Sequence, residues 1–263
     1  MKFSIIINTH NQKDYIVNCI LSCIRQNYKN FELIIVDSSN TKISNEILKK
    51  LKNKLFKYIH INPKFKYPEL NQLNKIEIGL KKAVGKYIVL LDGDDEFNKD
   101  KLLKLNNLIN KKDIICNQDY PLTVNGSYKY FEKIKKYKYN FFFRSFINDW
   151  PQIYGTSSIV VRRDIIKKFF NIAKPYNWRL LAIDAQLILF CKVKFIISSN
   201  IKGITFKNLH NNNLGSSYLN IFKKKFWIRR NMQHHYYSFL KNKLSFNVDF
   251  LITKIIYLLI KNL

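Results

Sequence analysis

The chain is poor in glycine and proline, with 7 and 5 of them among its 263 residues. This scarcity excludes a collagen-like or linker-dominated architecture. No stretch of about 18 uncharged apolar residues occurs, so we expect no transmembrane helix. The first apolar run, Phe3–Ile7, is too short for a signal peptide and is expected to form a buried strand.

Cysteine is also scarce, and its four copies, which include Cys116 and Cys191, form no Cys-x-x-Cys pair. Cys19 and Cys23 are four residues apart on an apolar helical stripe, which favours core thiols over metal ligands. Scattered cysteines in a chain of this length are typical of a reducing compartment. We therefore expect a cytoplasmic protein.

Acidic residues are few, with 18 Asp and Glu against 46 Lys and Arg, which gives a net charge of +28. Such a charge suggests a polyanionic partner: nucleic acid, an anionic membrane or a phosphorylated substrate. The abundance of Lys, Asn and Ile is equally typical of a very AT-rich genome, so the charge alone names no partner. The apolar fraction of 47% is enough for a sizeable core.

Short apolar runs alternate with helical patterns in the first half of the chain. Strands are expected at Phe3–Ile7, Phe31–Val36, Phe56–Ile61, Tyr87–Leu91 and Asp113–Cys116, and helices at Gln12–Gln26, Asn45–Lys54, Glu69–Ala83 and Lys99–Ile109. This alternation predicts βαβ units, and hence an α/β, Rossmann-like fold with a mostly parallel sheet flanked by helices.

The second half is less regular. Strands are expected within Tyr120–Tyr130 and at Ser157–Val161, Lys194–Ile197 and Gly203–Phe206, and helices at Arg163–Asn171, at Trp178–Phe190 and from about Ser216 to the end. We expect these elements to complete one domain, followed by a helical C-terminal extension.

Three carboxylates occur within four residues in Asp92-Gly93-Asp94-Asp95, directly after the apolar strand YIVLL. Such carboxylates repel one another unless a cation joins them, and oxygen ligands suit Mg²⁺ and Mn²⁺. Gly93 is expected to allow a tight turn that aims the flanking carboxylates at one point. A solvated Asp-Gly turn is the alternative, but the carboxyl end of a strand is where ligands bind in parallel sheets.

Asp37 ends another apolar run, Phe31–Val36. A carboxylate at this place can accept a hydrogen bond from a base N–H or a ribose hydroxyl. The segment Asp37–Asn40 also fits a helix N-cap or a turn, and taken alone this second interpretation is favoured.

In combination these segments resemble a known family. SIIINTHNQKDYIVNCILSCIRQNYKNFELIIVDSSN resembles the opening of family 2 glycosyltransferases of GT-A fold, through Thr9, the spacing of Ser22 and Gln26, and Asp37. GLKKAVGKYIVLLDGDDEFNKDKL resembles the family's next helix, strand and DxD loop. The resemblance covers residues 3–109 well and then weakens.

The resemblance implies a bacterial-type, inverting, metal-dependent glycosyltransferase. It would move a sugar from a nucleotide-diphosphate sugar to a saccharide or lipid-linked saccharide acceptor, in cell-surface polysaccharide or glycan biosynthesis. Thr9 and Asp37 would contact the nucleotide base, and Asp92 the ribose-phosphate side with Asp95 close by. Asp94 would hold Mn²⁺ or Mg²⁺. His210 is expected as a further metal or diphosphate contact, with an ordinary loop histidine as the alternative.

Two segments depart from the family pattern. The chain has Asn8-Thr9-His10-Asn11 where the family often has Pro-Thr-Tyr-Asn, and Ile76-Glu77-Ile78-Gly79 where Arg-Asn often precedes the glycine. The second departure leaves the donor contacts of that helix, and the identity of the nucleotide, open.

Transfer to a hydroxyl needs a general base. By the resemblance, Asp184 in NWRLLAIDAQL is the best match, and Asp149 beside Trp150 is the alternative. Asp184 also fits a surface acid on an amphipathic helix. Trp178, which precedes it, is expected to be available for stacking on a sugar face.

We expect residues 1–215 to form the GT-A domain, with a nucleotide-sugar-binding half at 1–118 and an acceptor half at 119–215. Residues 216–263 form the basic, aromatic extension, in which His234 and His235 are expected at the surface. Basic residues beside aromatic ones suit an anionic membrane, such as the inner face of the cytoplasmic membrane. Two helices packing back on the domain are the alternative. No RNA-binding signature occurs, so no nucleic acid partner is expected.

Two other classes remain as alternatives. A nucleotidyltransferase also uses metal-binding carboxylates on an α/β sheet, but it usually has a Gly-rich basic loop after the first strand, which NTHNQKDY lacks. A non-catalytic membrane-surface or nucleic-acid-binding protein on a GT-A-like fold is the other. The presence of Asp37, Asp92 and Asp94 argues against it.

Overall fold

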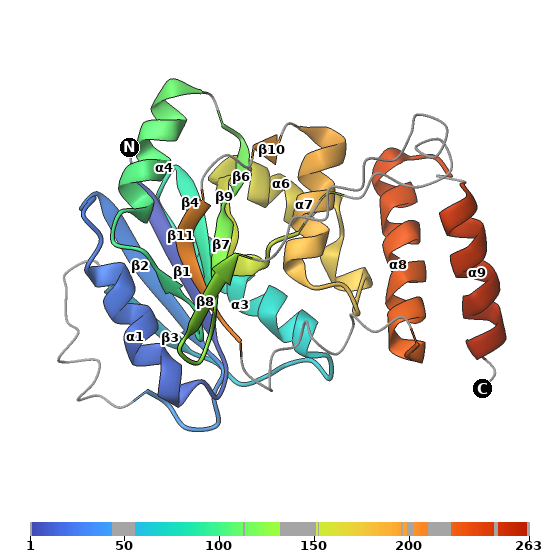
Figure 1. Cartoon of the computed structure of the whole chain (residues 1–263), viewed down its shortest axis with the longest axis horizontal. Helices are drawn as coiled ribbons and strands as arrows, with labels where there is room; N and C mark the ends of the chain where they lie inside the picture. The colour runs from blue at the N-terminus through green and yellow to red at the C-terminus, as the bar shows by residue number, and fades with distance from the viewer. Residues whose placement is uncertain are drawn as a thin grey trace.

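The structure is a computed structural model that describes residues 2–43, 56–112, 114–131, 151, 153–195, 197–198, 202–209, 222–244 and 247–261. A seven-stranded sheet with helices on both faces forms the body, and a smaller four-stranded sheet lies beside it. Figure 1 shows two further helices at the C-terminal end, on the side of the molecule away from the first strands. The expected helix Asn45–Lys54 lies outside the described residues.

Four parallel strands form one side of the large sheet, in the order β3-β2-β1-β4. They are β1 (Phe3–Thr9), β2 (Phe31–Asp37), β3 (Phe56–His60) and β4 (Tyr87–Asp92). Strands β1 and β2 are buried along their whole length. Strands covered on both faces need apolar residues at every position, which explains the uninterrupted runs in the sequence.

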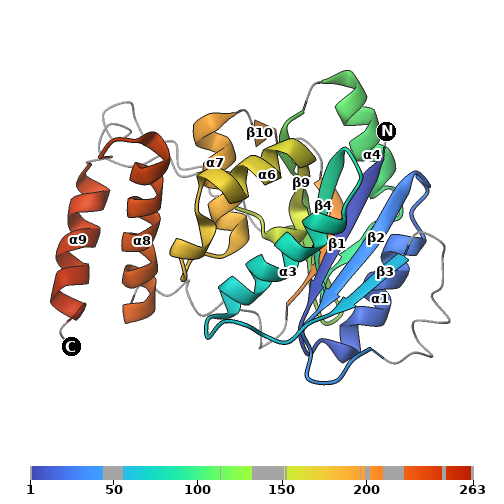
Figure 2. The ribbon, with the colours of Figure 1, turned by 180° about the vertical axis from the view of Figure 1, so that it is seen from behind.

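Helices cover both faces of this sheet, as Figures 1 and 2 show. On one face, α1 (Lys13–Ile24) and α4 (Lys101–Lys111) pack on side chains such as Ile5 and Ile7. On the other, α3 (Pro68–Lys82), α6 (Arg163–Ile172) and α7 (Ile183–Lys194) pack around Ile6. Neighbouring strand residues alternate between the two clusters, so both faces are covered, and together with the parallel pairings this confirms the mostly parallel α/β fold. All four cysteines are buried and unpaired, which confirms them as core thiols.

The other side of the large sheet departs from simple βαβ order. Strand β9 (Ile159–Arg162) runs antiparallel between β4 and β6 (Cys116–Gln118), and β10 (Ile197–Ser198) lies outside β6. A segment from late in the chain thus pairs directly with β4, the strand that ends in Asp92.

The smaller sheet has the order β5-β11-β7-β8. It comprises β5 (Glu96–Phe97), β7 (Tyr120–Asn125), β8 (Tyr128–Phe131) and β11 (Lys202–Asn208). Strand β5 directly follows the acidic loop, and it pairs with β11, so this sheet holds residues of the second half next to Asp94 and Asp95.

The second half also contains two short 3₁₀ turns, Thr156–Ser158 and Pro175–Asn177. The predicted helix Trp178–Phe190 was wrong at its start, because α7 begins only at Ile183. Gln186 donates hydrogen bonds to the carbonyls of Trp178 and Leu181, which tie the non-helical segment to the first turn of α7. Asp184 therefore lies at the beginning of this helix and not in its middle.

The C-terminal helices are α8 (Lys224–Lys241) and α9 (Val248–Lys261). Helix α8 is part of the main core, because Tyr236 and Leu240 belong to the cluster around Ile6. The Tyr236 hydroxyl also donates a 2.9 Å hydrogen bond to the Gln186 carbonyl of α7. Helix α9 packs on α8, with a 2.6 Å ion pair between Arg230 and Asp249.

His234 corrects one expectation for this region. Its side chain is fully buried, 3.4 Å from Asp249 and edge-on to the ring of Phe250, because it faces α9. His235 is exposed, as expected. In the described part of the chain, no helix combines the length and the hydrophobicity that a membrane span requires.

Candidate active site

The carboxyl ends of β1, β2 and β4 meet at one edge of the sheet. The strand register pairs Thr9 with Asp37 and Asn8 with Asp92, so the expected residues Thr9, Asp37 and Asp92 lie on neighbouring rungs. A parallel sheet produces this convergence from paired positions that are 28 and 84 residues apart in the sequence. It is the place where such sheets bind ligands.

The Asp37 carboxylate is buried and fixed from two sides. One oxygen accepts the backbone N–H of Ser39 at 2.8 Å and the Ser39 hydroxyl at 2.5 Å, which is the turn geometry that Asp favours. The other accepts the Tyr58 hydroxyl of β3 at 2.8 Å. Burial, followed by the hydrogen bond to Asp37 and the Asp37 charge, raises the pKa of Tyr58, so the phenol stays a donor to this carboxylate.

Thr9 and Gly93 pack against each other beneath the acidic loop. The Thr9 hydroxyl donates a 3.1 Å hydrogen bond to Gln12, and a Cβ on Gly93 would lie 2.6 Å from both side-chain oxygens. Gly93 does not have a positive φ. Among the described glycines, those with a positive φ are Gly126, Gly155 and Gly203. The expected tight turn is present, with the Asp95 N–H donating to the Asp92 carbonyl at 3.1 Å, but it is the close approach to Thr9 and Gln12 that requires the glycine.

Asp92 faces the interior of the site. One oxygen of its carboxylate accepts hydrogen bonds from Asn8 at 2.7 Å and from Gln72 of α3 at 2.9 Å. Burial and the charge of Asp94 raise its pKa to about 6, while the two amide hydrogen bonds oppose the shift. The charge of Asp184 on α7 adds a smaller upward contribution to the pKa of Asp92.

Asp95 is held by residues of the second half of the chain. Its carboxylate accepts the Ser157 hydroxyl at 2.5 Å and the backbone N–H of Asn208 at 3.0 Å. The Asn208 amide also donates to the Asp94 carbonyl at 2.6 Å. Burial, followed by the charges of Asp94 and Asp92, raises the pKa of Asp95. The acidic loop is thus clamped to β11 and to the Thr156–Ser158 turn.

Two buried lysines that the sequence interpretation missed lie under the site. Lys75 of α3 donates a 2.9 Å hydrogen bond to the Thr9 carbonyl. Burial lowers its pKa to about 8, although the charges of Asp92 and Asp37 oppose that shift. Lys101 of α4 forms a buried 2.8 Å ion pair with Asp119 and donates to the Ser157 carbonyl at 2.8 Å.

Asp184 lies in the first turn of α7, and one of its oxygens accepts the backbone N–H of Ala185 at 2.7 Å. Its side chain is partly exposed. The alternative base Asp149 and the expected metal contact His210 lie outside the described residues. Trp178 departs from expectation, because its ring packs against Tyr236 and Phe239 of α8, with centroids 5.1 and 5.6 Å away.

The carboxylates match the donor chemistry of a divalent cation without forming a complete ligand set. Across the described ranges, no three His, Cys, Asp or Glu side chains converge as metal ligands. Asp92 and Asp95 both have a raised pKa, because burial and the neighbouring carboxylates disfavour their charge. A cation beside Asp94 would offset this repulsion, so these residues fit Mg²⁺ or Mn²⁺ by charge and by ligand type.

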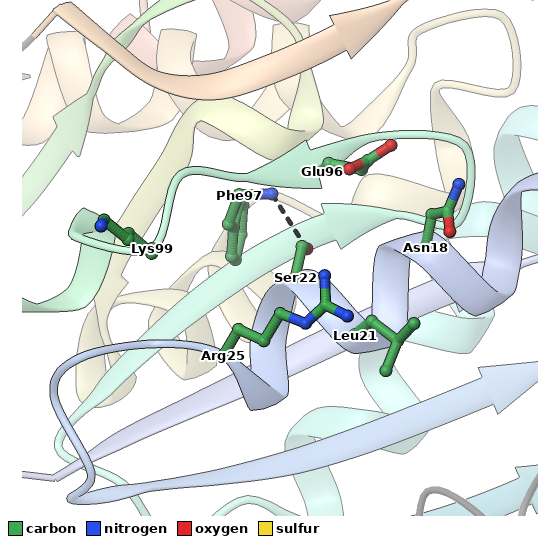
Figure 3. A pocket seen from close by; sticks show the side chains of 7 residues that line it. All are labelled: Asn18, Leu21, Ser22, Arg25, Glu96, Phe97 and Lys99. Carbon is green, nitrogen blue, oxygen red and sulfur yellow. Dashed lines mark hydrogen bonds between the residues drawn. The ribbon is translucent and has the colours of Figure 1, made fainter.

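Ser22 and Gln26 of the first helical segment prove to be anchors for the chain after the acidic loop. The Ser22 hydroxyl accepts the backbone N–H of Phe97 at 3.0 Å, as Figure 3 shows. Gln26 donates to the Asn98 carbonyl at 2.8 Å and accepts the N–H of Leu102 at 3.0 Å. This explains in physical terms why the two side chains occur four residues apart.

A shallow pocket of about 150 Å³ lies beside these anchors, between α1 and β5. Its lining comprises Asn18, Leu21, Ser22, Arg25, Glu96, Phe97 and Lys99. This set contains none of the site carboxylates, so we do not assign the pocket to the donor.

Comparisons with known proteins agree with this geometry. An uncharacterized glycosyltransferase of Rickettsia felis is 30% identical over 161 residues, which are 61% of this chain and 25% of that protein. The amylovoran biosynthesis glycosyltransferase AmsB of Erwinia amylovora is 30% identical over 111 residues, which are 42% of this chain and 36% of AmsB. The chain thus spans only a quarter to about a third of the length of these two relatives.

Solved structures resemble the whole chain. S. aureus TarS in complex with UDP has a TM-score of 0.63 at 17% identity, over 98% of this chain and 70% of that one. The mannosyltransferase PcManGT of Pyrobaculum calidifontis, in complex with GDP-Man and Mn²⁺, has a TM-score of 0.56 at 8% identity, over 89% and 63% of the two chains. At these identities the likeness concerns the fold, and it confirms the GT-A architecture.

The decisive comparison is with the family model. The model described as Glycosyl transferase family 2 matches residues 4–170, which is more than half of the chain. The matched region contains the converging ends of β1, β2 and β4 together with the acidic loop. This chain therefore belongs to glycosyl transferase family 2.

Proposed function

We propose that the chain is a glycosyltransferase that moves a sugar from a nucleotide-diphosphate sugar to a hydroxyl of a saccharide or lipid-linked saccharide, with inversion. The observation that carries the proposal is the meeting of Asp37, Asp92 and the acidic loop at one sheet edge, with Asp184 within electrostatic reach of Asp92. Inversion by single displacement needs a base on the side of the reacting carbon opposite the leaving diphosphate, and Asp184 would be that base.

The donor would bind along the ends of β1, β2 and β4. Thr9 and Asp37 would contact the nucleotide base. Asp92 would contact the ribose-phosphate side of the nucleotide, and Asp95 would lie close by. Because Asp37 is already fixed by Ser39 and Tyr58, its position is set before the nucleotide arrives. Such preorganisation reduces the entropy lost on binding.

Asp94 would hold a divalent cation, Mn²⁺ or Mg²⁺, with His210 as the further ligand. When bound, such a cation supplies positive charge that stabilises a leaving diphosphate. The chain's own contribution is to hold the loop, through Ser157 on Asp95 and Asn208 on the Asp94 carbonyl. This keeps the loop in place without help from the cation.

Asp184 would act as the general base and take the proton of the acceptor hydroxyl. A positioned base contributes about 10²–10⁴-fold to a reaction rate. The Ala185 N–H holds one oxygen of this carboxylate, and the start of a helix favours its negative charge. The hydrogen bond orients the carboxylate at the start of α7.

The relatives support a role in cell-surface polysaccharide or glycan biosynthesis. AmsB is named for amylovoran biosynthesis, and TarS for transfer of N-acetylglucosamine to poly(ribitol phosphate). The name of TarS gives a polymer as its acceptor and the name of AmsB gives a biosynthetic role, and both fit the saccharide acceptor that we propose here. The cytoplasm is the proposed location, because nucleotide sugars and free thiols such as Cys19 both belong to a reducing compartment.

A thermal-shift screen tests the proposal. The chain is mixed with UDP-, GDP-, CMP- and dTDP-sugars, each with Mn²⁺ and with a chelator. One class of donor should raise the melting temperature, and more so with Mn²⁺. Slow metal-dependent hydrolysis of that donor, measured next, would identify an active transferase. Stabilisation by nucleoside triphosphates alone would instead favour a nucleotidyltransferase, and no response to any donor would favour a non-catalytic protein.

A further inference from the structure

Helix α9 is apolar on two opposite sides. One side packs on α8 through Phe250 and Thr253, which are 3% and 0% exposed. The other side carries six large apolar residues with exposed fractions of 39 to 66%: Val248, Leu251, Ile252, Ile255, Leu258 and Leu259. We call these six the α9 stripe. In Figures 1 and 2 the helix lies at the outer end of the molecule, with α8 between it and the sheet.

The spacing of the α9 stripe makes it one continuous surface. Counted from Val248, its members recur at i, i+3, i+4, i+7, i+10 and i+11, which places them on one face along about three turns of the helix. Large apolar side chains scattered singly on a surface are ordinary, but six in one row are not. A row of this kind is typical of a helix that contacts a further apolar phase or partner.

The charges around the stripe favour an anionic surface as that partner. Lys254 is exposed and lies one turn from Leu251 and Leu258, on the border of the stripe. Further exposed lysines occur at the start of α8 and in the turn before α9, namely Lys223, Lys224, Lys225 and Lys243. A helix with an apolar face bordered by lysine lies in the interface of an anionic membrane. Two copies of a chain with a charge of +28 repel each other, which disfavours a second copy as the occupant.

We propose that the α9 stripe binds the surface of an anionic lipid membrane, with α9 parallel to it. A 14-residue helix is about 21 Å long, which is shorter than the hydrocarbon core of a bilayer. The lysines contact lipid headgroups while the stripe enters the boundary of the acyl chains. This proposal is independent of the proposed reaction, since neither helix carries a candidate site residue.

Sedimentation with lipid vesicles tests the proposal on the full chain. The vesicles are phosphatidylcholine alone, or phosphatidylcholine with phosphatidylglycerol, at low and high salt. Ile255→Glu is compared with Ile172→Glu. The two isoleucines have nearly the same exposed fraction, 51% and 52%, but Ile172 is on α6 and does not belong to the α9 stripe. The pair Ile255→Ser and Ile172→Ser removes the apolar side chain without adding a charge. Circular dichroism verifies that all four variants are folded.

We expect the parent chain to bind the anionic vesicles, and to bind less at high salt. Both Ile255 variants should lower the partition coefficient about tenfold, and both Ile172 variants by less than about twofold. Equal losses at the two positions would overturn the proposal and attribute binding to the general charge. Equal binding to both kinds of vesicle would overturn it too. If the chain forms a dimer without lipid, and only the Ile255 variants dissociate that dimer, the stripe binds a second copy of the chain and the proposal is wrong.

Discussion

The hydroxyl of Ser157 donates a 2.5 Å hydrogen bond to the carboxylate of Asp95. The same oxygen accepts the backbone N–H of Asp92 at 3.0 Å, so one side chain joins both ends of the acidic loop. Ser157 precedes β9, which pairs with β4. A residue of the second half of the chain therefore fixes the loop that the first half provides.

Replacing Ser157 tests this clamp. Ser157→Ala leaves the buried Asp95 with one donor fewer, which costs about 1–3 kcal/mol, and loosens the loop. We expect a lower melting temperature and a weaker affinity for the nucleotide diphosphate, measured by calorimetry. Ser158→Ala is the matched control, because Ser158 donates to the Gly155 carbonyl at 2.6 Å and its hydroxyl touches neither carboxylate. It should lower stability but leave affinity unchanged, and equal affinities for both variants would refute the clamp.

Asp94 is predicted to carry the metal dependence. Asp94→Ala should abolish Mn²⁺-dependent binding of the nucleotide diphosphate and leave the fold intact, because it removes a ligand of the bridging cation. Calorimetric titration of the nucleotide with and without Mn²⁺ measures this. Asp164→Ala, at an acid on α6 that pairs with Arg162, is the control. Undiminished turnover in Asp94→Ala would contradict the metal assignment.

Asp184 is predicted to be the general base. Asp184→Asn should retain donor binding and reduce the transfer rate about 10²–10⁴-fold, since the amide cannot accept the proton. Single-turnover rates of Asp184→Asn and Asp149→Asn are to be compared at saturating donor. If only the change at Asp149 stops transfer, the base is Asp149.

Glu32 is predicted to stabilise the fold in a pH-dependent way. Burial disfavours its charge, but hydrogen bonds from Ser4, from the Val84 N–H and from Lys57 outweigh this and lower its pKa. A carboxyl whose pKa is lower in the folded state stabilises above its unfolded pKa, and this contribution is lost as the pH falls through the folded pKa. Urea unfolding should show Glu32→Gln to be less stable at about pH 7, with the difference shrinking below about pH 4. A difference that is constant with pH would contradict this.

The parallel part of the fold could be predicted because it is local. Each of the runs at β1, β2 and β4 is apolar at nearly every position, and each is followed by a helical period and a polar loop. Strand β9 was expected as a strand, but not between β4 and β6, since its pairing depends on contacts about seventy residues apart along the chain. Strand β5 has two residues, too few for any periodic signal.

The candidate site could be predicted only where it follows a strand. Asp37 and Asp92 were found by that rule, but Ser157 and Asn208 act through pairings that no spacing indicates. The two buried lysines did leave a signal. Lys75 precedes Gly79 by four residues and Lys101 precedes Leu105 by four, so both lie on the inward faces of their helices. A lysine at such a position needs buried partners, and that pattern could have identified both.

The insertion of β9 beside β4 also has a consequence for the order in which the chain can fold. Strands β1 to β4 are complete once residue 92 has been made, but the free edge of β4 is covered only by residues 159–162. At a synthesis rate of about 5–20 residues per second, this edge stays open for several seconds on the ribosome. An open strand edge recruits other strands. Residues 1–118 produced alone should therefore aggregate, even though they contain the converging ends of β1, β2 and β4.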